Sequence, residues 1–95
     1  MVSFTVRMTF EQGDHEEIVA TLCHLTEASR KEPGCVSYIP HFVEGDPCMV
    51  LIYEQYTDEA ALDAHRNSSH FHQYAIGGLY QKMRQRQIEN LTAVC

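Results

Sequence analysis

The sequence predicts a single α+β domain whose strands and helices follow the order β-α-β-β-α-β. Residues 1–10 alternate between apolar and polar side chains, as a strand with one buried face does. The segment after Gly13-Asp14 repeats apolar residues at helical spacing, and two later apolar runs are joined by a short turn. The chain has 95 residues, a length typical of one domain.

The first strand and the first helix have the clearest patterns. The apolar side chains of residues 1–10 share one face, namely Val2, Phe4, Val6, Met8 and Phe10. We expect a capping box at the start of the helix, because Glu17 lies three residues after Asp14. Glu32-Pro33-Gly34 ends the helix at about Lys31. The residues that repeat along its inward face are Ile18, Leu22, Leu25 and Ser29.

A β-hairpin is expected next, with strands at 35–43 and 49–56 and a turn at 44–47. The strand at 49–56 is apolar on both faces over its first half, which is typical of a strand that is covered on both sides. Alternation groups Glu54 with Val50, Ile52 and Tyr56, opposite Tyr53, and leaves open which group faces the helices.

The last part of the chain predicts helical segments and a final strand. A helix capped by Thr57 or Asp58 runs from 59 to about 66, and a second helical segment begins at Ser68. We expect Gly77-Gly78 to form a hinge or break. Helix resumes briefly at 79–84, and the last strand spans 86–94.

This order of elements is the split β-α-β arrangement of the ferredoxin-like fold, a four-stranded antiparallel sheet with both helices on one face. One layer of helices covers only one face of the sheet. The first strand, however, has a strongly apolar face, and the strand at 49–56 is apolar on both faces, so both faces of the sheet need a cover. We therefore expect a homodimer in which two sheets pack face to face. The alternative is a monomer with an exposed apolar sheet face, which is unusual.

Composition argues against several classes of partner. Seven Lys and Arg against 13 Asp and Glu give a net charge of -6, whereas nucleic acids and anionic membrane surfaces attract basic proteins. No apolar run approaches the roughly 20 residues of a membrane helix, and residues 1–10 lack the pattern of a secretion signal. The four cysteines show no C-x-x-C spacing, so we interpret them as reduced thiols of a cytoplasmic protein: Cys23, Cys35, Cys48 and Cys95.

Several sequence blocks occur together in one order. They are Glu32-Pro33-Gly34-Cys35, Tyr38, Asp46-Pro47, Tyr53-Glu54-Gln55-Tyr56-Thr57-Asp58, Ala60-Ala61-Leu62-Asp63-Ala64-His65 and Ser69-His70-Phe71. Over residues 2–94, as one domain, the chain resembles the antibiotic biosynthesis monooxygenase family, and most of all its quinol-monooxygenase-like members. The resemblance implies a ferredoxin-like fold and a dimeric α+β barrel.

The resemblance leaves several activities open. Members include cofactor-independent oxygenases of phenols and quinols, haem-degrading enzymes, an isomerase of a phosphorylated sugar and proteins without known activity. The haem-degrading relatives use a Trp and an Asn on the first strand. This chain has no Trp, and its first strand offers Ser3, Thr5 and Arg7 instead.

His65 is the first candidate for a catalytic residue. It follows the inward stripe of the helix at 59–66, and a neutral imidazole accepts a phenolic proton at neutral pH. The resemblance also places a His at this position. Glu54 is the candidate that orients it, because a carboxylate bound to one ring nitrogen raises the basicity of the other. The alternatives are a hydrogen-bonded core histidine and a carboxylate that complements the next helix.

Aromatic and polar groups are the candidates for binding a planar substrate. They are Tyr38, Tyr53, Phe71, Tyr74, Arg7 and His70. The aromatic side chains have the alternative of simple core packing, and Arg7 has that of an ion pair across the sheet.

No metal or organic cofactor is expected. His65, His70 and His72 are spaced H-x4-H-x-H, which does not place all three on one helix face. Gly77-Gly78 is not a nucleotide-binding fingerprint. The function that we expect is a cofactor-independent monooxygenase or oxidase of a small aromatic quinol or phenol, with dioxygen as co-substrate. The alternatives are a non-oxidative isomerase-type enzyme and a non-catalytic dimeric binding protein.

Overall fold

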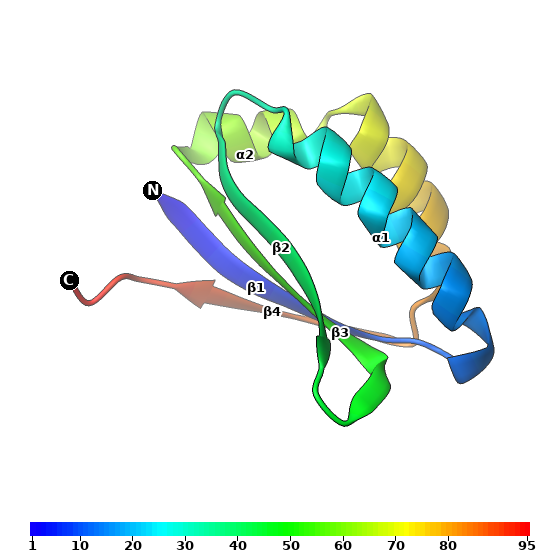
Figure 1. Cartoon of the computed structure of the whole chain (residues 1–95). Coiled ribbons are helices and arrows are strands. Elements are labelled where there is room, and N and C mark those ends of the chain that lie inside the picture. The colour runs from blue at the N-terminus through cyan, green and yellow to red at the C-terminus, as the bar shows by residue number, and fades with distance from the viewer.

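Four strands form one antiparallel sheet in the order β2-β3-β1-β4, and the helices lie on one face of it (Figure 1). This computed structural model describes all 95 residues. The strands are β1 (Val2–Thr9), β2 (Cys35–Val43), β3 (Asp46–Tyr56) and β4 (Gln85–Leu91). The helical elements are η1 (Gln12–Asp14), α1 (His15–Arg30), α2 (Glu59–Arg66), the π-helical η2 (Phe71–Leu79) and α3 (Tyr80–Lys82). The predicted ferredoxin-like α+β fold is confirmed.

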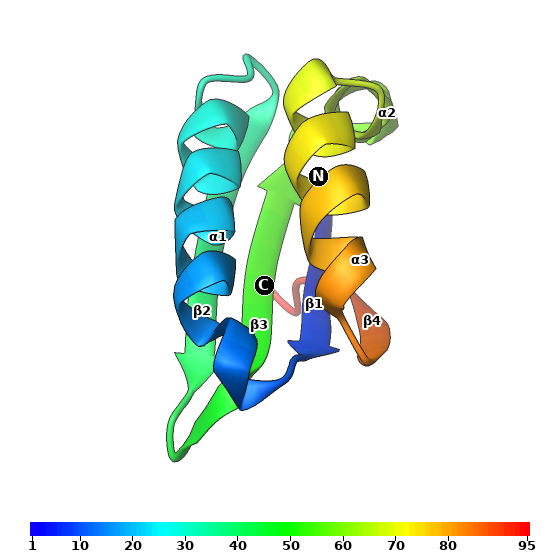
Figure 2. The same cartoon turned by 90° about the vertical axis from the view of Figure 1, so that its right-hand side faces the viewer.

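The helices form two columns over the sheet. Figure 2 shows α1 over β2 and β3, and the column of η2 and α3 over β1 and β4. The short helix α2 lies at the end of the sheet where β3 ends (Figure 1). The arrangement creates an enclosed layer between the sheet and the helices, and the residues described below lie in it.

The alternation of β1 decides which face is buried. Phe4, Val6 and Met8 are buried against the helices, and their partners on β3 are Glu54, Ile52 and Val50. The group of β3 residues that contains Glu54 and Tyr56 therefore faces the helices. The sequence left this choice open because β3 is apolar on both sides.

The first helix buries the predicted stripe, but its predicted cap is wrong. Ile18, Leu22, Leu25 and Ser29 are all buried. The side chain of Asp14 accepts no hydrogen bond at the start of α1. The turn η1 precedes the helix directly, so Asp14 has a near-helical backbone rather than the extended one of a capping residue.

The hairpin turn is tighter than predicted. The strand β3 begins at Asp46, three residues before the expected start, and Glu44-Gly45 alone make the turn. Gly45 has a φ of 82°, in the left-handed region that glycine tolerates best. The carboxylate of Asp46 accepts a hydrogen bond from the backbone N–H of Cys48 and so stabilises the beginning of the strand.

In the C-terminal half one predicted helix cap is confirmed, and two other predictions are wrong. Asp58 caps α2 by accepting a 2.8 Å hydrogen bond from Ala61 N–H. The helix does not break at Gly77-Gly78, because η2 continues through both residues. A Cβ on Gly78 would lie 3.0 Å from Thr21 on α1, so the glycine allows two helices to approach. The last strand spans Gln85–Leu91 rather than 86–94.

The sheet face away from the helices, called the outer face below, has mixed polarity. On β1 it carries Ser3, Thr5, Arg7 and Thr9, and on β3 it carries Met49, Leu51, Tyr53 and Gln55. The four apolar side chains of β1 all belong to the other face, so the apolar surplus is smaller than the sequence suggested. The homodimer stays a prediction.

Two further findings concern the whole chain. None of its helices has the length and apolar character that crossing a membrane requires. All four cysteines are unpaired.

Candidate functional site

His65 is the centre of a buried polar cluster under the helical layer. It lies in the last turn of α2, and only 2% of its surface is exposed. Its ring is surrounded by the aromatic rings of Tyr38, Tyr56 and Phe71, with centroid separations of 5.8, 5.1 and 5.2 Å. An imidazole in such apolar surroundings needs internal hydrogen-bond partners.

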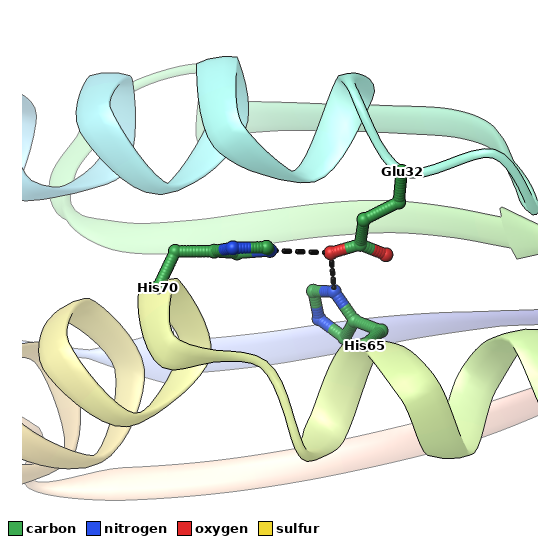
Figure 3. Close-up of side chains that lie close together, drawn as sticks. All are labelled: Glu32, His65 and His70. Carbon is green, nitrogen blue, oxygen red and sulfur yellow. Dashed lines mark hydrogen bonds and ion pairs between the residues drawn. The ribbon is translucent and has the colours of Figure 1, made fainter.

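Glu32 is the main partner of His65. It follows α1 in the Glu32-Pro33-Gly34 segment, and its Oε2 lies 2.8 Å from Nδ1 of His65. The same oxygen lies 2.5 Å from Nε2 of His70, so two imidazoles converge on one carboxylate oxygen (Figure 3). A carboxylate only accepts, so both ring nitrogens donate. A neutral His65 therefore has its unprotonated nitrogen at Nε2.

Glu54 lies on the other side of the His65 ring. Its Oε1 is 3.6 Å from Nε2 of His65 and accepts a 2.6 Å hydrogen bond from the hydroxyl of Tyr56. Burial raises the pKa of Glu54 from its ordinary 4.5 to about 7, against the lowering effect of the Tyr56 hydrogen bond and the charge of Arg66. A carboxyl group with such a pKa exchanges a proton near neutral pH.

Burial also sets the protonation of the neighbouring rings. It lowers the pKa of His65, although the hydrogen bond and the charge of Glu32 act in the opposite direction. Desolvation raises the pKa of Tyr38 and of Tyr56, so both phenols keep their protons. At neutral pH the site thus contains a neutral imidazole beside a carboxyl group of nearly balanced protonation.

A small cavity of about 40 Å³ adjoins the pair. His65, Glu54 and Phe71 line its inner side, and Tyr80 and Arg86 lie at its helical and strand sides. Arg86 donates a 2.8 Å hydrogen bond to the hydroxyl of Tyr80. This volume holds a few water molecules at most, because one water needs roughly 10–15 Å³ on this measure. Entry of an aromatic ligand therefore requires side chains to move.

The predicted site residues fall into two groups. The structure brings His65, Glu54, Tyr38, Phe71 and His70 together in the buried layer. Their roles in binding and catalysis stay predictions.

The other three predicted residues lie apart from His65. Tyr74 stacks on His24 at 5.4 Å, in an open groove between α1 and η2. Tyr53 and Arg7 lie on the outer face of the sheet, where Arg7 contacts the sulfur of Met49 at 3.3 Å. Alternation separates Tyr53 from Glu54, and it separates Arg7 from Val6 in the same way.

Sequence reasoning missed Glu32 and Tyr56. In the sequence Glu32 belongs to the Glu32-Pro33-Gly34 segment that ends the first helix, and this segment is also one of the blocks that carry the family resemblance. Tyr56 was grouped correctly with Glu54 by alternation, and the two side chains lie two residues apart on one face. An i, i+2 pair of a phenol and a carboxylate on a buried strand face is the signal that points to this hydrogen bond.

The same cluster has donor atoms that suit a metal ion. The ligand atoms of Glu32, His65 and His70 all lie within 4.8 Å of one another. The sequence predicts no metal site, because the spacing of His65, His70 and His72 does not place all three on one helix face. The structure supplies the third donor from a segment more than thirty residues earlier.

Comparisons with known proteins agree with this fold. A family model described as antibiotic biosynthesis monooxygenase matches residues 1–75. The uncharacterized protein sll1783 of Synechocystis sp. is 37% identical over 59 residues, which are 62% of this chain but only 40% of that longer protein.

Two crystal structures are similar over nearly the whole chain. One, of an antibiotic biosynthesis monooxygenase, has a TM-score of 0.91 and 24% identity and covers 100% of both chains, which shows the shared fold. The other, of PA3566 from Pseudomonas aeruginosa, has a TM-score of 0.89 and 28% identity and covers 99% of this chain and 94% of that one. With the family model matching more than three quarters of its length, this chain belongs to the antibiotic biosynthesis monooxygenase family.

Proposed function

We propose that the protein is a monooxygenase that oxidises a small electron-rich phenol or quinol with dioxygen and without an organic cofactor. The observation that carries the proposal is the hydrogen bond from Nδ1 of His65 to Glu32. It leaves Nε2 as a proton acceptor beside Glu54, in a buried and aromatic-lined site. Family membership supports a monooxygenase-like role.

In this proposal Nε2 of His65 accepts the phenolic proton, and the neighbouring carboxyl group of Glu54 exchanges this proton with the imidazole. The resulting phenolate is a strong reductant and passes one electron to dioxygen, and the radical pair recombines to a peroxide. Loss of water from the peroxide gives a quinone, so that a phenol and dioxygen yield a quinone and water. The substrate supplies all the electrons. The protein contributes the base, the orientation and the exclusion of water.

The surrounding residues have supporting roles in the proposal. Tyr38 and Phe71 are walls for a planar ring, and His70 holds Glu32 in place through its own hydrogen bond. Tyr80 and Arg86 move apart to admit the substrate, because the closed cavity is too small for it.

We further propose that a second copy of the chain covers the outer face and that the dimer acts in the cytoplasm. The support for the dimer is the set of half-exposed apolar side chains on the outer face, among them Leu51, Tyr53 and Ile39. Unpaired cysteines support a reducing compartment. Residues Arg7 and Tyr53 then contact the partner rather than the substrate.

A second candidate function is favoured by the size of the cavity. A site of about 40 Å³ fits a protein that binds a small molecule weakly or not at all, and that carries out no oxidation.

An isomerase-type reaction is the other alternative, and it uses the same His65 and Glu54 as acid and base without dioxygen.

The experiment that separates these candidates is a screen of hydroquinones, naphthols and related phenols in an oxygen electrode. Oxygen uptake by the wild-type protein that is lost in His65→Gln and retained in His72→Gln supports the proposal. His72 is the matched control because it is an exposed histidine seven residues farther along the chain, in η2. Ligand binding without oxygen uptake supports the second candidate.

A further inference from the structure

We propose that Glu32, His65 and His70 together bind one divalent transition-metal ion of the Zn²⁺ type. The site lies between the end of α1, the end of α2 and the start of η2 (Figure 3). It would occupy the hydrogen-bonded cluster described above and so compete with the proposed role of His65.

The donor set and its geometry suit such an ion. Two imidazole nitrogens and one carboxylate oxygen are common ligands of Zn²⁺, at about 2.0–2.2 Å from the metal. Tetrahedral donors around such an ion are roughly 3.3–3.6 Å apart. The nitrogens of His65 and His70 now lie 2.8 and 2.5 Å from the same Glu32 oxygen. A small outward rotation of the three side chains makes room for an ion that replaces the two shared protons.

A buried oxygen without a partner lies in the same cluster. The second carboxylate oxygen of Glu32, Oε1, is buried and has no hydrogen-bond partner. Leaving a buried acceptor unsatisfied is costly, and both carboxylate oxygens can bind a cation. The cluster thus has one more acceptor than its two donors satisfy.

The outer environment of His65 also matches a metal ligand. A ligating histidine usually donates its other N–H to a carboxylate. Nε2 of His65 faces Oε1 of Glu54 at 3.6 Å, and Tyr56 fixes that carboxylate with a 2.6 Å hydrogen bond. If Nδ1 bound the metal, the proton of the neutral ring would lie on Nε2 and point at Glu54.

The cluster is open to solvent on one side. An open groove between α1 and η2 has a volume of about 490 Å³, and Glu32 and His70 are among its lining residues. The side chain of His70 is 20% exposed there. Glu27 adds a second carboxylate to the groove, whereas Lys31 is its only lysine or arginine, so the lining has more acidic than basic side chains. An ion can enter from this side, and water completes its coordination.

A consequence for activity rests on the proposed function. With a metal ion on Nδ1, Nε2 carries the proton of His65 and has no lone pair to accept one from a phenol. Zn²⁺ should therefore inhibit oxygen uptake, and a chelator should restore it.

The test is a Zn²⁺ titration in competition with a chromophoric chelator. It is done on Cys23→Ser/Cys95→Ser protein, because exposed thiols also bind zinc. We expect one ion per chain and an affinity lower by more than about 100-fold in His70→Ala, which loses a ligand. His72→Ala should bind as tightly as the parent. Glu54→Gln should weaken binding by about 10–100-fold through the orientation of His65.

Two results overturn the metal site: no binding at millimolar free Zn²⁺, or binding that is equally tight in His70→Ala. Both are measured without substrate. Absence of oxygen uptake from every phenol counts against the proposed function alone. Bound Zn²⁺ that leaves oxygen uptake unchanged overturns the inhibitory consequence.

Discussion

The imidazole of His65 donates a 2.8 Å hydrogen bond to the carboxylate of Glu32, a residue 33 positions earlier in the chain. The bond joins the segment after α1 to the end of α2. It also orients the ring so that its second nitrogen faces Glu54. Whatever the protein acts on, the position of His65 depends on how closely these two segments approach.

Gly34 allows that approach, and Gly34→Ala tests it. A Cβ at this position would lie 2.3 Å from Cβ of Ala61 and 3.2 Å from Oγ1 of Thr57, and neither neighbour has a flexible end that can move away. We expect Gly34→Ala to lower the free energy of unfolding by about 1–3 kcal/mol, as overpacking does. Urea denaturation measures it.

Gly13→Ala is the control for this change, because a Cβ there has no neighbour within 4 Å. Equal stability of the two variants would show that the contact between Gly34 and Ala61 is relaxed in solution.

The fold was predictable because its signals are local. The alternation of β1, the apolar stripe of α1 and the turn at Gly45 each depend on residues within a few positions of one another. The cap at Asp14 failed because a turn ahead of the helix changed the backbone of that residue. The predicted break at Gly77-Gly78 is wrong because η2 continues through both residues, where Gly78 allows a close approach to Thr21 of α1.

The site was only partly predictable for a different reason. His65 and Glu54 were found from residue type and position, whereas the role of Glu32 depends on a contact between distant segments. Tyr53 is a candidate because β3 is apolar on both faces and its orientation is open, whereas Arg7 is one because it is a charged residue in the middle of β1. The burial of Phe4, Val6 and Met8 on the paired strand resolves the orientation of β3.

Glu54→Gln should change how stability depends on pH. Because the pKa of Glu54 rises from 4.5 unfolded to about 7 folded, its contribution to stability is complete below pH 4.5 and is lost as pH rises through 7. Gln does not ionise. The stability of Glu54→Gln relative to wild type should therefore increase between pH 4.5 and about pH 7, by about 3 kcal/mol at most.

Urea denaturation at several pH values, with EDTA present, measures this difference. Glu16→Gln, at an exposed position of α1, is the control and should follow the wild-type curve. A constant difference between Glu54→Gln and wild type across this range would contradict the raised pKa.

The outer face should form a homodimer. We expect analytical ultracentrifugation at micromolar concentration to give twice the 10.9 kDa of one chain. Leu51→Glu should dissociate the dimer, because a carboxylate from each chain would then be buried where the two outer faces meet. Val19→Glu, an exposed position on α1, should not. A wild-type species near 11 kDa would contradict the dimer.

Tyr56→Phe should raise the pKa of Glu54 above about 7. The Tyr56 hydroxyl donates a 2.6 Å hydrogen bond to Oε1 of Glu54, and this bond favours the ionised carboxylate. Without it, we expect an increase of about one to two pH units, from the value of a hydrogen bond to a charged group. Carbon NMR titration of the glutamate carboxyl groups measures it. Tyr53→Phe on the outer face should leave the value unchanged.

His65→Ala tests the central residue of the site. As the base, His65 should contribute about 10²–10⁴-fold to kcat/KM for any oxidised quinol. Its removal also leaves Glu54 without its imidazole neighbour and opens space among Tyr38, Tyr56 and Phe71, so a loss of about 1–3 kcal/mol in stability is expected as well.

The two effects separate when turnover is expressed per folded molecule, with the folded fraction taken from a melting curve of the same sample. His65→Gln, which fills more of the space, should recover part of the stability without recovering turnover, because an amide does not accept a proton near neutral pH. A folded His65→Ala protein with wild-type turnover would show that the ring only supports the core. The base would then have to be Glu54, whose pKa of about 7 suits the same proton transfer.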